Sequence, residues 1–261
     1  MIGWPDAGSR PAVLTALIGA MSGLAWLALW RLEATLWGRW FHAHGSGAGG
    51  HGPHDGAGAL SPLWLGVVFV AGWVVMTVAM MLPTTLPLLD LFQRLTANRR
   101  EHLLLLGLVG AGYLVAWAAF GAVVFAVSLL LRAALTYVTL SPKVAPAALL
   151  LVAGAFQFSR LKYRCLERCR SPLSFVTTRW RGANERWQSF RLGLDHGLFC
   201  VGCCWALMLL MFVTGTASLV LMLALGAIMA VEKNAPWGRR ISAPLGVVLL
   251  AGAALVLSWP D

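Results

Sequence analysis

Residues 103–131 read LLLLGLVGAGYLVAWAAFGAVVFAVSLLL and contain no charged side chain. A helix needs about 20 mostly apolar residues to cross a bilayer, so this stretch predicts a transmembrane helix. The rest of the chain is similar, with 59% hydrophobic residues, 11% charged residues and a mean hydropathy of +0.76. This composition is typical of integral membrane proteins and leaves no room for a large soluble domain.

The apolar pattern predicts an all-α, polytopic membrane helix bundle that forms a single integral membrane domain over residues 1–261. We expect about seven transmembrane helices, or six if the fifth and sixth form one broken helix. The expected spans are residues 11–30, 62–82, 103–131, 144–159, 196–213, 216–231 and 241–259. The fourth span is short and relies on the long side chains of Lys143 and Arg160 to reach the headgroups.

The net charge of +10 comes from Lys and Arg residues whose positions along the chain fit a membrane topology better than a nucleic-acid-binding surface. If the N-terminus is placed inside, sixteen of the twenty Lys and Arg residues fall in inside loops. By the positive-inside rule, this bias predicts a cytoplasmic N-terminus and a multi-pass protein of the inner (cytoplasmic) membrane. No nucleic-acid recognition motif accompanies the charge, so the lipid bilayer and not nucleic acid is the expected partner.

The five cysteines fall in two short clusters, one ending the fourth span and one opening the fifth. In a helix the side chains of each cluster share a face, and two helices whose cytoplasmic ends meet would supply four sulfurs. Sulfur-rich sites in a reducing compartment favour Cu(I), with zinc or an iron–sulfur cluster as alternatives. The predicted metal ligands are Cys165, Cys169, His196, Cys200, Cys203 and Cys204.

Two further sets of side chains are additional candidate ligands. Met76 and Met80 share a helix face and carry soft thioethers, although Met is also an adaptable packing residue. The Gly-rich segment 42–58 is predicted to be a flexible outside loop. Its imidazoles would form a mobile metal collector, or else belong to a polar linker without a binding role. They are His42, His44, His51 and His54.

Two acidic residues lie on the same membrane side as the thiols. Asp195 and Glu232 are candidates to orient the metal ligands, and Glu232 could instead pair with Lys233 or with neighbouring arginines. Nearby, segment 171–191 carries aromatic residues among arginines, and several of these aromatics share one helical face. This pattern predicts one amphipathic helix in the cytoplasmic headgroup plane.

Four distinctive sequence motifs follow one another along the chain. They are WVVMTVAMMLP (73–83), GAFQFS (154–159), CLERCRSP (165–172) and GLDHGLFCVGCCWALM (193–208), followed by Glu232-Lys233. In these motifs the chain resembles the predicted metal-binding integral membrane proteins catalogued as domain of unknown function 2182. The resemblance implies a multi-span inner-membrane protein suspected of metal binding, sometimes labelled a copper chaperone. Arg160 stands where that family often has proline, and the His-rich loop is not part of its pattern.

The leading hypothesis is a metal-binding membrane protein that binds or relays copper as Cu(I) at the cytoplasmic ends of two helices. One alternative is a membrane thiol–disulfide or electron-transfer protein that uses the C-x-x-C of Cys200 and Cys203. Another is a non-catalytic assembly subunit for a membrane metalloenzyme. The expected protein partner is accordingly a copper-handling protein or a metalloenzyme. No nucleotide-binding or hydrolase motif points to an enzyme.

Overall fold

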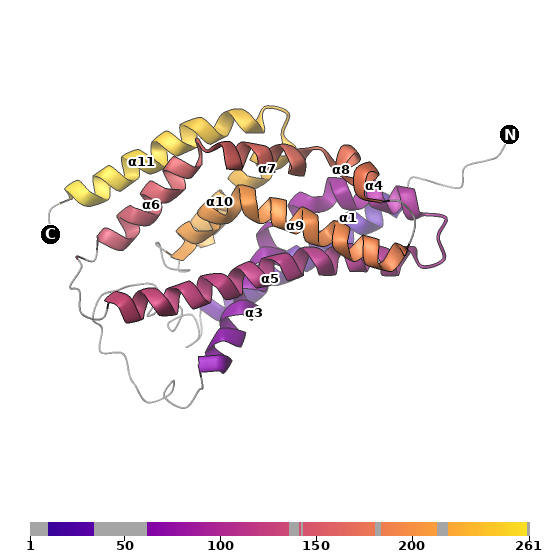
Figure 1. Cartoon of the computed structure of the whole chain (residues 1–261), viewed down its shortest axis with the longest axis horizontal. Coiled ribbons are helices and arrows are strands. Elements are labelled where there is room, and N and C mark those ends of the chain that lie inside the picture. Colours follow the sequence, from indigo (N-terminus) through magenta and orange to yellow (C-terminus); the bar gives the residue numbers. More distant parts are fainter. Residues whose placement is uncertain are drawn as a thin grey trace.

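The computed structural model is helical in all the regular structure that it describes. The described residues are 10–33, 62–135, 141, 143–180, 184–212 and 219–259. Their helices pack into a bundle that is elongated along α5 (His102–Leu135) (Figure 1). The all-α class is therefore confirmed for this part of the chain. The predicted loop 42–58, with its four histidines, lies outside the described residues.

Five helical segments are long and apolar enough to cross a membrane. They are α1 (Arg10–Glu33), α3 (Pro62–Met80), α5, α9 (Glu185–Leu209) and η3 (Gly238–Ile241) joined to α11 (Ser242–Ser258). A sixth span results if α6 (Val144–Phe156) and α7 (Arg160–Arg170), which are bent by 64°, are counted as one.

Among the described residues there are thus five or six candidate spans, whereas the sequence predicted about seven, or six as the alternative. The difference lies in two segments. The fourth expected span ends early because the helix bends after Phe156. The sixth corresponds to α10 (Leu219–Asn234), whose 16 residues extend about 24 Å, less than the thickness of a bilayer core.

The α5 and α9 helices run parallel and lie side by side along the molecule (Figure 1). An ion pair between Glu101 and Arg186 joins their starts. Further along, a Cβ atom on Gly193 would collide with the carbonyl oxygen of Val109, and one on Gly112 would collide with the α9 backbone. Glycine at these positions lets the two backbones approach closely, as small residues do between membrane helices.

Residues 171–191 do not form the single interfacial helix that their pattern predicts. The segment divides between α8 (Pro172–Arg179) and the first turns of α9, which begins at Glu185. Trp180, expected at the headgroups, packs edge-on against Phe92, with 5.0 Å between ring centroids. The aromatic residues of this segment are thus partly internal, because α4 (Leu86–Thr96) offers them an apolar face.

The amphipathic helix of this region is α7. Its arginines Arg160, Arg164 and Arg168 are exposed, whereas Lys162 and Cys165 face inward. The inward face of α7 packs against α9. The cysteines of α7 therefore meet those of α9 along the sides of the two helices.

The core shared by α3, α9 and α10 is rich in methionine. The seven methionines on these helices, on η2 (Leu210–Phe212), which follows α9, and directly after α3 are all buried. They are Met76, Met80, Met81, Met208, Met211, Met222 and Met229.

Candidate metal centre

The thiols of α9 lie on its buried face. Cys200, Cys203 and Cys204 are at most 1% exposed. The Sγ of Cys203 lies 3.4 Å from the Sγ of Cys204 and 4.0 Å from the Sγ of Cys169 on α7. The Cys203 thiol also donates to the main-chain oxygen of Cys200, one helical turn earlier, at 3.2 Å. These four free thiols, Cys169, Cys203, Cys204 and Cys200, are called the thiol row below.

Cys165 stands apart from the thiol row. Its Sγ faces the α9 backbone, where a Cβ atom on Gly202 would lie only 2.6 Å away. Among the described residues, no group of three or more His, Cys, Asp or Glu side chains is arranged so that it could hold a metal ion. The thiols are therefore close neighbours, but as they stand they do not form a closed coordination shell.

The Cys200 end of the row meets a buried ammonium group. The Nζ of Lys233, which is 6% exposed, donates to the Sγ of Cys200 at 2.7 Å and to Thr84 Oγ1 at 3.3 Å. It also lies 3.5 Å from the Sδ of Met81, and the hydroxyl of Tyr113 lies 3.0 Å from the Cys200 sulfur. A buried charge needs such polar partners, and here they come from α9 and from the segment after α3.

A second buried ammonium group forms a full ion pair. Lys162 on α7 and Glu232 on α10 are 0% and 1% exposed, and the Lys162 Nζ lies 2.8 and 2.9 Å from the two carboxylate oxygens. Lys162 also donates to Gln157, and Ser242 donates to Glu232 at 2.7 Å. The sequence offered Lys233 or an arginine as the partner of Glu232, and the structure gives Lys162 instead. Arg170 reaches only the main-chain oxygen of Glu232.

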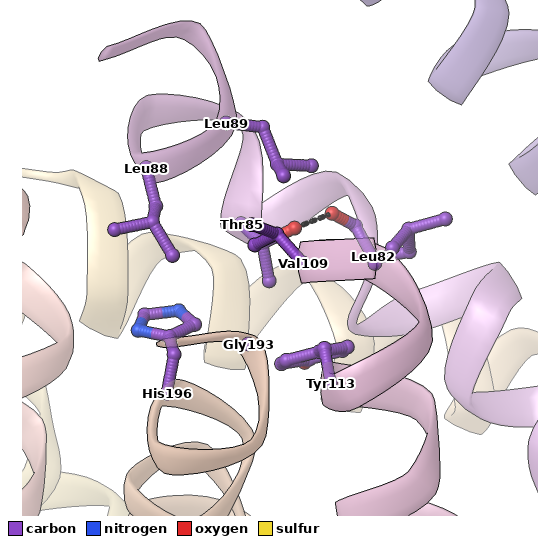
Figure 2. Close-up of a pocket in the computed structure, with 9 residues that line it drawn as sticks. Leu82, Thr85, Leu88, Leu89, Val109, Tyr113, Gly193 and His196 are labelled. Carbon is purple, nitrogen blue, oxygen red and sulfur yellow. Dashed lines mark hydrogen bonds between the residues drawn. The ribbon is translucent and has the colours of Figure 1, made fainter. Parts of the chain in front are cut away.

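The imidazole of His196 points into a small pocket beside the Cys200 end (Figure 2). The side chain is 4% exposed, and its Nδ1 has no hydrogen-bond partner within the part of the chain that the structure describes. The rings of Tyr113 and Phe175 flank it, with centroids 5.9 and 5.5 Å away. The lining residues are Leu82, Thr85, Leu88, Leu89, Val109, Gly110, Tyr113, Gly193 and His196. An unpaired buried nitrogen here is free to serve as a ligand.

Other predicted site residues have different surroundings. The Asp195 carboxylate pairs with Arg179 on α8 at 2.8 Å. Arg179 also lies over the ring of Phe175, so Asp195 ties α8 to α9. Met76 and Met80 are buried in the core, whereas Met81, which was not among the predicted ligands, is the methionine in contact with Lys233.

The described helices and the thiol row together define a helical protein with segments long and apolar enough to span a membrane and a buried set of soft donor atoms. The chain belongs to the copper chaperone family PpoB2, whose sequence profile matches residues 70–256. The match begins within α3, ends within α11 and includes all five cysteines. Comparisons with curated proteins and with solved structures gave no match. The family assignment made from the motifs is therefore confirmed, and the family label supports a role with copper.

Proposed function

We propose that this protein is a copper chaperone of the cytoplasmic membrane that binds Cu(I) through the thiol row. The observation that carries the proposal is the 4.0 Å separation of the Cys169 and Cys203 sulfurs, which come from two different helices. Two sulfurs at that separation can both lie about 2.3 Å from one ion, the usual zinc–thiolate distance. Thiolates are soft ligands that suit Cu(I), and the copper chaperone label of the family favours this ion over zinc.

Lys233 supports this choice of ion through its charge. Cu(I) held by two thiolates carries a net charge of −1, which is costly in an apolar interior unless a cation lies nearby. The ammonium of Lys233, 2.7 Å from the Cys200 sulfur, supplies that cation inside the bundle. His196 is the remaining donor near the Cys200 end, and we assign it to the ion's passage into or out of the row.

The charge distribution supports a cytoplasmic position for the thiol row. Ion pairs join Arg99 to Glu185 and Arg186 to Glu101 at the starts of α5 and α9. Lys143 lies at the opposite end of the bundle, where it donates to the Trp259 carbonyl. Because cytoplasmic loops are enriched in Lys and Arg, we assign the end with the ion pairs to the cytoplasm.

Cys169 is the one member of the thiol row that is not fully buried. It therefore offers the route by which a cytoplasmic partner could exchange Cu(I) with the row. The expected partner is a copper-handling protein or a metalloenzyme that receives the ion.

The test is a competition titration of purified protein with a coloured Cu(I) chelator under anaerobic conditions. Loss of an outer-shell partner typically lowers metal affinity about 10–100-fold, so we expect Cys203→Ser, which removes a ligand, to lower it at least tenfold. Cys165→Ser is the matched control, because Cys165 lies outside the row, and it should bind like wild type. Wild-type protein that takes no Cu(I) from the chelator would refute the function.

The same distances favour one second candidate, a thiol–disulfide protein. Cys203 lies close enough to Cys169 on the facing helix that a small side-chain movement would allow a disulfide to form. Thiol trapping in glutathione buffers separates the two functions. A redox protein shows a reversible disulfide at a potential near that of its compartment, whereas a copper chaperone shows thiols that Cu(I) protects from alkylation.

A further inference from the structure

Methionine is unevenly distributed over the described part of the chain. The seven methionines on α3, directly after α3, and on α9, η2 and α10 are all buried in one contiguous core. Met21 on α1, by contrast, is 39% exposed. Packing alone does not require sulfur at these positions, because leucine fills nearly the same volume. The thioether sulfurs therefore call for an explanation other than shape.

Part of this core reaches the thiol row through Lys233. The Met81 sulfur lies 3.5 Å from the Nζ of Lys233, and the same Nζ lies 2.7 Å from the Cys200 sulfur. Met81 follows the last residue of α3, so the end of α3 and the Cys200 end of the row meet at one buried point.

From this point, methionines continue along α3 and α10. The Cε atom of Met80 lies 3.2 Å from the position of a Cβ atom on Gly226, so α3 and α10 meet there. Met76 lies one turn from Met80 on the same face of α3. On α10, Met229 and Met222 are four and eleven residues from Lys233, or about 6 and 16 Å along the helix. Thioethers thus recur along both helices as they lead away from the thiol row.

Thioethers suit the movement of Cu(I) better than its retention. They are soft donors that Cu(I) accepts, but they carry no charge and bind more weakly than thiolates. Passage through a protein requires several sites that bind an ion strongly enough to admit it and weakly enough to release it. The neutral methionine sulfurs along α3 and α10, which lead to the Cys200 end of the thiol row, would bind Cu(I) strongly enough to admit it and weakly enough to release it.

We propose that Met76, Met80, Met222 and Met229, here called the methionine ladder, form a weaker Cu(I)-binding region that passes the ion to Cys200 by way of Met81. This inference rests on the proposed Cu(I) function and extends it from a single site to a route. The ion remains Cu(I) throughout, so no oxidant or reductant is consumed.

The test removes the thiols first. Purified protein with all five cysteines changed to serine is titrated with Cu(I), kept reduced by ascorbate, and competed with a weak Cu(I) chelator. We expect this variant to retain Cu(I) binding at least tenfold weaker than wild type, with sulfur ligands in its X-ray absorption spectrum. Adding M76L, M80L, M222L and M229L should lower the remaining affinity at least tenfold further, whereas adding M21L should leave it unchanged.

Each other outcome decides the question. If wild type binds Cu(I) but the five-serine variant binds none, or if the leucine changes have no effect on it, the ladder is only packing. If wild type itself binds no Cu(I), the proposed function fails instead. The single changes M80L and M229L are made in the same five-serine variant. Gel filtration and circular dichroism of each protein then distinguish a loss of Cu(I) binding from a loss of folding. Each single change should weaken binding by itself.

Discussion

At the residue scale, the site contains two buried lysines with different partners. Lys162 has a carboxylate in Glu232, and Lys233 has the Cys200 sulfur with two weaker polar contacts. A paired buried charge contributes little net stability, but removing one partner leaves an isolated charge that is strongly destabilising. The two lysines should therefore respond differently to substitution.

Glu232→Gln should destabilise the fold. The change leaves Lys162 buried without a counter-charge, and we expect the free energy of unfolding to fall by about 3–5 kcal/mol. Unfolding in mixed micelles measures this loss. Glu167→Gln is the matched control, because its pair with Arg239 is about half exposed and such pairs contribute about 0–1 kcal/mol. The double change Lys162→Met with Glu232→Leu should recover most of the loss, and equal losses in both Gln variants would contradict the argument.

Lys233→Leu should weaken copper binding more than it weakens the fold. It removes the cation beside Cys200, so the negative charge of a loaded thiol site loses its nearest compensation. We expect at least a tenfold lower Cu(I) affinity, which corresponds to about 1.4 kcal/mol or more. Lys143→Leu, at the opposite end of the bundle, should bind Cu(I) like wild type in the same chelator competition. Unchanged affinity in Lys233→Leu would show that the ammonium has no part in binding.

At the element scale, the contact between α5 and α9 depends on glycine. Gly193→Ala would force a methyl group into the Val109 carbonyl oxygen, so the helices would have to separate. We expect a loss of about 1–3 kcal/mol, as for an overpacked core, and weaker Cu(I) binding because α9 carries three thiols of the row. Thermal unfolding in detergent and chelator competition measure the two effects.

Gly107 on the same helix pair is the control for this prediction. Nothing lies within 4 Å of a Cβ atom on Gly107. Alanine there should keep or raise stability by about 0.5–1 kcal/mol, since glycine weakens a helix interior. A Gly193→Ala protein as stable as Gly107→Ala would mean that the close backbone approach is not needed.

The sequence predicted the helices well and their junctions poorly. Long charge-free runs such as residues 103–131 correspond to single helices, because periodicity and length determine that outcome locally. The bend after Phe156 and the division of segment 171–191 depend on what packs against them, which no local pattern records.

The candidate site was predicted in part. The cysteines were recognised by type and spacing, whereas Lys162 was not predicted to have a role in the site. A signal for it was present, since Lys162, Leu166 and Cys169 are spaced at i, i+4 and i+7 and so share one face of a helix. Glu232 and Lys162 are 70 residues apart, so their pairing required the tertiary structure.

At the scale of the whole molecule, orientation is the property to test. In a five-serine background, single cysteines at Lys143 and Arg100 mark opposite ends of α5 and its neighbours. An impermeant maleimide should label K143C in right-side-out vesicles and R100C in inside-out vesicles, because the basic end is assigned to the cytoplasm. The reverse labelling pattern would place the thiol row on the outer side and favour structural disulfides over Cu(I) binding.

The ion pair between Lys162 and Glu232 also has a consequence for biogenesis. Because the chain is synthesised from the N-terminus, Lys162 leaves the ribosome 70 residues before its partner. Until α10 has been synthesised, burial of α7 would leave the Lys162 ammonium unpaired in an apolar interior. We therefore expect α7 and its two cysteines to remain at the membrane surface until then. The nascent chain would then have no complete thiol row, and only the finished protein could capture copper.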